Sequence, residues 1–143
     1  MNDLETARNN LRRKALTLAI VKNGEALFET RSHRISGFLN AVENLGDRLR
    51  NASLADKVAG KAVALLCVYA QISAVYAETL SGKAKILLEK NGIHTDWKEL
   101  VDNILDLDRS DVCPFEKTAE KLSDPKEAFK AFKALQESLK CAD

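Results

Sequence analysis

The centre of the chain, residues 53–67, reads Ser53-Leu54-Ala55-Asp56-Lys57-Val58-Ala59-Gly60-Lys61-Ala62-Val63-Ala64-Leu65-Leu66-Cys67. From Val58 onward almost every position is apolar, and the few charges, Asp56, Lys57 and Lys61, lie near the beginning. A helix that is apolar on all faces runs through the interior of a protein. The segment therefore predicts a buried helix that begins near Leu54 and carries its charges at its N-terminus.

Before this segment, the sequence predicts a helix, a β-hairpin and a second helix. Leu4, Ala7 and Leu11 recur at helical spacing in the first dozen residues. Two short apolar runs, 16–21 and 26–30, then flank the pair Asn23-Gly24. This pair favours a type I′ hairpin turn, because both central residues of that turn need a positive φ. The apolar pattern over 35–45 predicts an amphipathic helix that ends near Gly46.

After the central segment, the pattern alternates between strand and helix. Residues 72–78 predict a buried strand, and residues 84–88 a helix that ends at Asn91-Gly92. A short strand over 93–95 and a helix over 96–105, capped by Asp96, are expected next. Pro114 and Pro125 each fit the first turn of a further helix. This order predicts a single α/β domain over residues 1–143, a three-layer α/β/α sandwich around a small mixed sheet.

The composition argues against two classes of macromolecular partner. The chain holds 22 basic and 21 acidic residues, which gives a formal net charge of +1 with both signs mixed along the whole length. Such a balance gives no electrostatic reason to expect binding to nucleic acid or to a membrane. The N-terminus lacks the pattern of a signal peptide, and Cys67, Cys113 and Cys141 form an odd, scattered set. A cytoplasmic protein with reduced thiols is expected.

Several motifs together resemble a known family: Val21-Lys22-Asn23-Gly24-Glu25, Ala55-Asp56-Lys57-Val58-Ala59-Gly60-Lys61-Ala62, Val75-Tyr76-Ala77-Glu78, Asn91-Gly92-Ile93 and Cys113-Pro114-Phe115-Glu116-Lys117. They are similar to those of a family of uncharacterised prokaryotic proteins that is defined as a domain of unknown function. The resemblance covers roughly residues 11–122 and leaves the two terminal helices outside. It implies a fold like that of cytidine deaminase without the zinc site, and it implies no activity.

The residues themselves also argue against the chemistry of a zinc deaminase. A zinc deaminase needs a His or Cys ligand two residues before a catalytic Glu, and a later Pro-Cys-x-x-Cys motif. Here the order is reversed in Cys113-Pro114, and the histidines, His33 and His94, lie near no cysteine in the sequence. Phosphate-loop, dinucleotide and serine-hydrolase motifs are missing from the sequence as well. We expect no metal and no cofactor.

Four residues form the predicted site. Asp56 fits either a helix cap with Ser53 or a ligand role. Lys57 and Lys61, four apart on a helix, either reach solvent and pair with a carboxylate, or bind an anion with help from the helix N-terminus. Cys113, directly before Pro114, either sits at a helix cap that stabilises a thiolate or is an inert apolar residue.

These residues support three hypotheses of function. The first is a binding domain for a small anionic or nucleotide-like ligand held by Asp56, Lys57, Lys61 and Cys113. The second is an enzyme in which Cys113 is the nucleophile, or Lys57 or Lys61 an activated amine, while Asp56 moves protons. The third is a homo-oligomer that docks the Phe129–Phe132 face of its last helix onto another copy. Other notable residues are expected to be structural: Cys67, Tyr76 and Trp97 in the core, and His94 in packing or on the surface.

Overall fold

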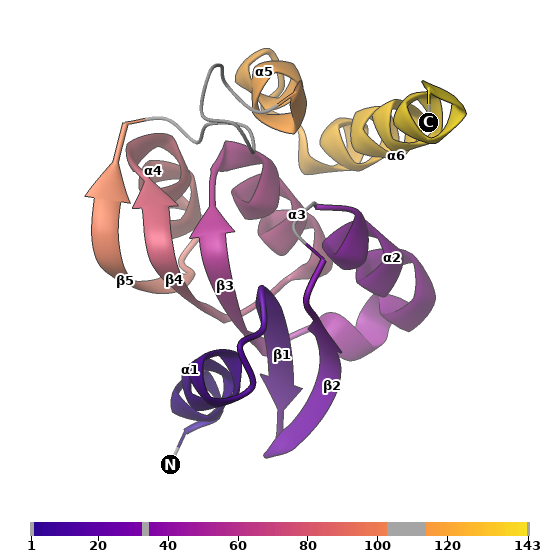
Figure 1. Ribbon diagram of the computed structural model, residues 1–143. Helices are drawn as coiled ribbons and strands as arrows, with labels where there is room; N and C mark the ends of the chain where they lie inside the picture. The colour runs from indigo at the N-terminus through magenta and orange to yellow at the C-terminus, as the bar shows by residue number, and fades with distance from the viewer. Residues whose placement is uncertain (1, 33–34, 103–113, 143) are drawn as a thin grey trace.

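A five-stranded mixed sheet forms the centre of the computed structural model, which describes residues 2–32, 35–102 and 114–142 (Figure 1). The strand order is β2-β1-β3-β4-β5. Its members are β1 (Leu18–Lys22), β2 (Glu25–Thr30), β3 (Ser53–Ala59), β4 (Ala74–Ser81) and β5 (His94–Val101). β1 pairs antiparallel with β2 and β3, whereas β3, β4 and β5 run parallel.

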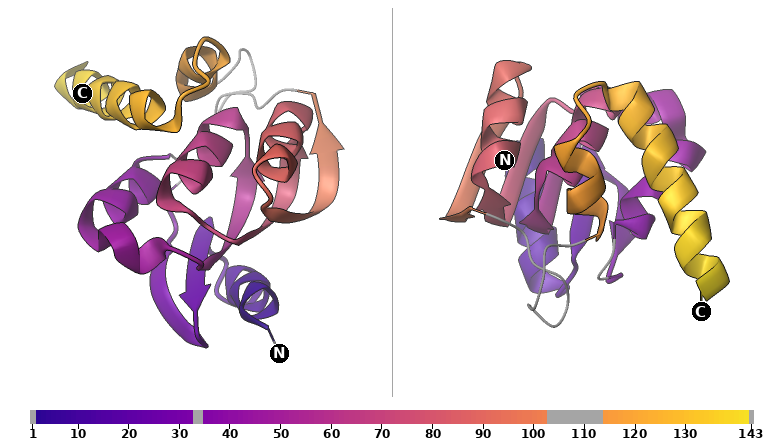
Figure 2. Two further views of the ribbon diagram at one scale, coloured as in Figure 1. Left: turned by 180° about the vertical axis from the view of Figure 1, so that it is seen from behind. Right: turned by 90° about the horizontal axis from the view of Figure 1, so that it is seen from above.

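Helices cover both faces of this sheet (Figure 2). On one face lies α1 (Asp3–Arg13), which contacts β1 and β3 most extensively. On the other face lie α2 (Ser36–Leu45), the 3-10 helix η1 (Gly46–Leu49), α3 (Lys61–Ala70) and α4 (Gly82–Lys90). Both α5 (Pro114–Glu120) and α6 (Pro125–Ala142) pack against α3. The predicted α/β/α sandwich around a mixed sheet is confirmed.

Two apolar clusters form the core, one on each face of the sheet. The larger lies beneath α2, α3 and α4 and contains fully buried side chains such as Leu39, Leu65 and Leu66. The smaller lies beneath α1 and includes Leu11 and Tyr76. On the face of the sheet that α1 covers, α1 packs mainly on β1 and β3. It does not extend over the edge strand β5.

The predicted hairpin is confirmed, and the N-terminal helix holds its turn. Asn23 and Gly24 have φ values of 54° and 79°, as a type I′ turn requires. The Asp3 carboxylate, in the first turn of α1, accepts hydrogen bonds from the backbone N–H groups of Asn23 at 2.8 Å and Gly24 at 2.9 Å. This contact fixes the start of α1 against the sheet.

The expected helix from Leu54 is wrong in its first part. Residues 53–59 form β3, and the helix begins at Lys61. Leu54 faces the larger apolar cluster while Ala55 faces the smaller one, so both faces of the strand are buried. A strand buried on both faces shows no alternation of apolar and polar residues, which makes it resemble a buried helix in sequence.

The expected helix over 96–105 is also wrong where the structure describes it. Residues 94–101 form the edge strand β5, whose parallel ladder with β4 outweighs the helical spacing of its apolar side chains. Trp97, predicted to lie in the core, is 36% exposed. By contrast, the end of α4 before Asn91-Gly92 and the helix starts at Pro114 and Pro125 are confirmed.

Candidate functional site

The predicted site residues do not share one location. Asp56 and Lys57 are neighbours in β3, so their side chains point to opposite faces of the sheet. Lys57 is exposed, and Lys61 is the first residue of α3. Cys113 lies outside the described residues, and so does the side chain of Cys141. Since Asp56 is in mid-strand, the expectation that it caps a helix is wrong.

Asp56 is nevertheless an unusual carboxylic acid. Its side chain is 9% exposed and accepts a hydrogen bond of 3.2 Å from the backbone N–H of Val58. Burial raises the pKa of Asp56 to about 7. Burial, together with the charge of Asp56, also raises the pKa of the Cys67 thiol in α3. No basic side chain among the described residues forms an ion pair with Asp56, so the acid is held by backbone amides alone.

The N-terminus of α3 holds a carboxylate that belongs to the protein itself. Glu116, in α5, accepts hydrogen bonds from the backbone N–H groups of Lys61 at 3.0 Å and Ala62 at 2.7 Å. Glu116 is 8% exposed, and burial raises its pKa although the two amide donors oppose that shift. Free N–H groups at a helix N-terminus attract anions. Here the Glu116 carboxylate of the same chain fills this position. The sequence did not predict this contact.

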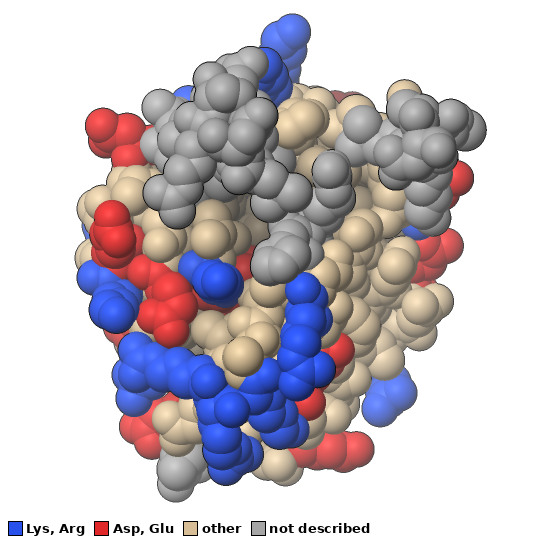
Figure 3. All heavy atoms as spheres, in the orientation of Figure 1, with Lys and Arg blue, Asp and Glu red and all other residues tan. Residues whose placement is uncertain are grey.

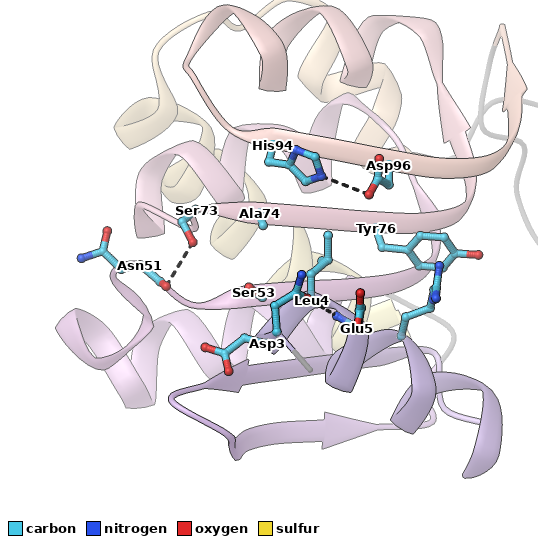
Figure 4. Close-up of a pocket in the computed structure, with 12 residues that line it drawn as sticks. Asp3, Leu4, Glu5, Asn51, Ser53, Ser73, Ala74, Tyr76, His94 and Asp96 are labelled. Atoms are coloured by element: carbon cyan, nitrogen blue, oxygen red, sulfur yellow. Dashed lines mark hydrogen bonds and ion pairs between the residues drawn. The ribbon is translucent and has the colours of Figure 1, made fainter.

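A polar pocket lies elsewhere, between the N-terminal half of α1 and the first residues of β3, β4 and β5 (Figure 4). Its volume is about 410 Å³. The lining residues come from segments far apart in the sequence: Asn2, Asp3, Leu4, Glu5, Arg8, Asn51, Ser53, Ser73, Ala74, Tyr76, His94 and Asp96. None of the motifs in the sequence predicted this site.

Tyr76 lines the pocket, and two guanidinium groups lie close to its ring. Those of Arg8 and Arg12 lie 5.7 Å and 5.6 Å from the centre of its ring. Arg12 also donates a hydrogen bond of 2.9 Å to the Tyr76 hydroxyl, which donates one of 2.7 Å to Glu78. Hydrogen bonds from Tyr76 and Arg12 lower the pKa of Glu78 against the opposing effect of burial.

Arg8 differs from Arg12 in that one of its side-chain nitrogen atoms has no hydrogen-bond partner among the described residues. This atom is Nε, and it is buried. Three other polar side chains of the pocket are already engaged. Asp3 holds the hairpin turn, His94 Nε2 lies 3.0 Å from an Asp96 oxygen, and the Ser73 hydroxyl donates to the Asn51 carbonyl at 3.1 Å (Figure 4). Arg8 is therefore the clearest unmet donor in the pocket.

The surface around the pocket carries both signs of charge. Lys and Arg side chains gather over the α1 part of this face, and acidic side chains lie beside them over β4 and β5 (Figure 3). The described residues include no group of three or more His, Cys, Asp and Glu side chains that could hold a metal ion. Among the same residues, no helix is both long and apolar enough to cross a membrane.

Comparisons with known proteins identify relatives of the fold. None of the curated proteins matches the chain. A diaminohydroxyphosphoribosylaminopyrimidine deaminase/5-amino-6-(5-phosphoribosylamino)uracil reductase from Thermotoga maritima shows a weak structural likeness, with 18% identity, a TM-score of 0.44, and coverage of 83% of this chain and 37% of that chain. A DUF1893 family protein from Thermotoga maritima is 25% identical with a TM-score of 0.83, over 93% of this chain and 89% of that chain.

The comparison with protein families gives the assignment. The family described as a domain of unknown function, DUF1893, matches residues 6–136, which is most of the chain and includes most of α1 and most of α6. The predicted relationship to a family of this kind is confirmed, and the match extends beyond the expected range of 11–122 at both ends. This chain belongs to the DUF1893 family.

Proposed function

We propose that this protein binds a small anionic molecule in the pocket between α1 and the starts of β3, β4 and β5. The observation that carries the proposal is Arg8, which lines the pocket and whose buried Nε has no hydrogen-bond partner among the described residues. A buried polar group without a hydrogen bond costs free energy, and such groups in native proteins commonly bind a water, an ion or a ligand. A carboxylate or phosphate oxygen is the acceptor that a guanidinium binds best.

The surroundings narrow the ligand to a small, polar one. Ser53 and Glu5 also line the pocket, so the ligand carries hydroxyl or amine groups besides its anionic group. A nucleobase is not favoured, because the Tyr76 ring is 4% exposed and already contacts Arg8 and Arg12. The proposal therefore keeps the anionic ligand that the sequence suggested, but it moves the site from Lys57 and Lys61 to the pocket at Arg8.

Thermal unfolding in the presence of simple anions tests this proposal. Inorganic phosphate and citrate are the probes, and the melting temperature of the full chain is measured with each. A ligand present at 100 times its Kd stabilises the folded state by about 2.7 kcal/mol. Arg8→Met removes the guanidinium and should abolish the stabilisation. Arg13→Met is the matched control, because Arg13 lies in the same helix, donates to Asn10 and does not line the pocket.

A second pair of variants separates this pocket from the site predicted by sequence. Lys57 and Lys61 stay a predicted anion site, and replacing both with Met tests it in the same assay. If the double lysine variant loses the stabilisation while Arg8→Met keeps it, the anion binds at the strand and helix ends instead. If neither phosphate nor citrate shifts the melting temperature of the wild type, the result argues against both sites.

We also infer a cytoplasmic location. The free thiol of Cys67, a residue of α3, is buried, and the sequence shows no pattern of paired cysteines. Such thiols are typical of a reducing compartment. Fractionation of the native cells, followed by immunodetection, should recover the protein with cytoplasmic markers. Recovery with exported proteins would contradict the inference.

A further inference from the structure

Strand β5 is an open edge of the sheet. It contains eight residues and pairs with β4 in regular register, whereas the pairing at the other edge, between β1 and β2, shifts register between Ile20 and Val21. Six of its residues are exposed, and none is a proline. Natural edge strands are usually protected by bulges, prolines, covering segments or charged side chains, because an open edge is a template for another strand. Of these devices β5 shows charged side chains, Asp96, Lys98 and Glu99, so a partner strand must match its charges. The described residues place no further strand beside β5.

The free backbone groups of β5 can be assigned from one hydrogen bond. The His94 N–H donates to the Ser73 carbonyl at 3.1 Å, so the backbone groups of His94 point toward β4. In a parallel pair, residues along a strand point their N–H and C=O groups alternately toward one neighbour and away from it. The groups of Thr95, Trp97 and Glu99 therefore point outward, where a further strand would bind.

The charges of β5 select one way of pairing with a second copy. In an antiparallel pair around a two-fold axis at Trp97, Asp96 lies opposite Lys98 of the second copy, and this contact occurs twice. Thr95 and Trp97 then exchange backbone hydrogen bonds with Glu99 and Trp97 of that copy. Axes at residues 96, 98 or 99 place two identical charges opposite each other. An axis at Thr95 or at Leu100 pairs little more than one end of the strand. Like charges directly opposite destabilise a sheet.

We propose that β5 is a homodimer interface, in which two copies join their sheets antiparallel with the two-fold axis at Trp97. The Asp96–Lys98 pairs occupy non-hydrogen-bonded positions, where Cα atoms lie about 4.5 Å apart and side chains interact most closely. The two Trp97 side chains meet on the α4 face of the sheet. There the Trp97 ring is 36% exposed, and the Lys85 ammonium lies 5.3 Å from its centre.

The surface that the sequence suggested for self-association is already used within the chain. Phe132 is fully buried and packs edge-on against Phe115, with ring centres 6.0 Å apart. Phe129 stacks on Tyr69 at 4.9 Å. Because these aromatic side chains of α6 already pack against residues of the same chain, β5 is the better candidate for the interface.

Charge reversal in solution tests the dimer. The molar mass of the full chain, measured by light scattering across a concentration series, should reach twice 15.8 kDa. Asp96→Lys places lysines opposite each other, and Lys98→Asp places carboxylates opposite each other. Each variant should shift the protein toward monomer. The double variant Asp96→Lys/Lys98→Asp restores opposite charges in reverse order and should recover the dimer.

Glu127→Lys is the matched control, because it makes the same charge change at an exposed position of α6, away from β5. It should leave the dimer intact, and circular dichroism should show all variants folded. A wild-type protein that stays monomeric over the whole series would overturn the proposal. So would a dimer that survives both single reversals, since another surface would then hold the two copies. These outcomes do not depend on ligand binding at Arg8.

Discussion

The carboxylate of Glu116 occupies the space in which a side chain of residue 60 would lie. A Cβ atom on Gly60 would come within 2.4 Å of the Glu116 carboxyl carbon. The absence of a side chain at Gly60 therefore lets a carboxylate from α5 reach the first backbone amides of α3. This contact joins the C-terminal part of the chain to the end of the central strand, and it explains why a glycine separates β3 from α3.

Gly60→Ala should destabilise the protein by displacing that carboxylate. We expect a loss of about 1 to 3 kcal/mol, because a helix cap is lost and a buried charged group is left with weaker hydrogen bonds. Denaturant unfolding of Gly60→Ala, Glu116→Ala and the double variant measures the effect. The two costs should be strongly non-additive, since both substitutions remove the same contact. Additive costs would show that Gly60 acts independently of Glu116.

Asp56 should make the protein less stable as the pH rises. In the unfolded chain its carboxyl loses its proton near the ordinary pKa of 3.8, whereas in the folded protein burial holds the proton until a pKa of about 7. The folded state therefore binds more protons between these values, and the free energy of unfolding falls with pH by up to about 4 kcal/mol. Asp56→Asn should remove this contribution.

Denaturant unfolding between pH 4 and pH 8 checks this prediction. Asp56→Asn should gain stability relative to the wild type as the pH rises, with the largest gain at pH 8. Asp47→Asn serves as the control, because the Asp47 side chain is 99% exposed. Parallel pH profiles for wild type and Asp56→Asn would contradict the account.

Cys67 should be the last of the three cysteines to react with an alkylating reagent. Its side chain is fully buried, and burial raises the pKa of its thiol, so both access and thiolate formation are unfavourable. Alkylation followed by mass spectrometry gives the rate at each site. For Cys113 the sequence predicts the fastest reaction, at mildly acidic pH. Early labelling of Cys67 in the folded protein would show that α3 opens from the sheet.

Local sequence signals predicted the elements that depend on local chemistry. Asn23-Gly24 identified the hairpin, and Pro114 and Pro125 identified helix starts, because turn and cap preferences act over a few residues. β3 was missed, and β5 was predicted only at its start, over residues 93–95, for a different reason. Their conformation is set by pairing with β4, a long-range contact that apolar spacing within one segment does not reveal.

The pocket could not be predicted for a similar reason. Arg8, Ser73 and His94 lie far apart in the sequence, and the order of the strands brings them together. Arg8 carries no distinguishing signal, since it is one of several basic residues in α1. Lys57 and Lys61 were predicted instead, because a helix that began near Leu54 would have placed both lysines on one helical face, whereas α3 begins at Lys61.

The most direct test of ligand binding at Arg8 is an NMR titration of the full chain with phosphate and citrate. Amide signals of residues that line the pocket, Ser53, Ser73 and His94 among them, should shift with saturation in the wild type and in Arg13→Met. The same signals should stay unchanged in Arg8→Met. Shifts confined to residues near Lys57 and Lys61, or the same shifts in Arg8→Met as in the wild type, would contradict the proposed site.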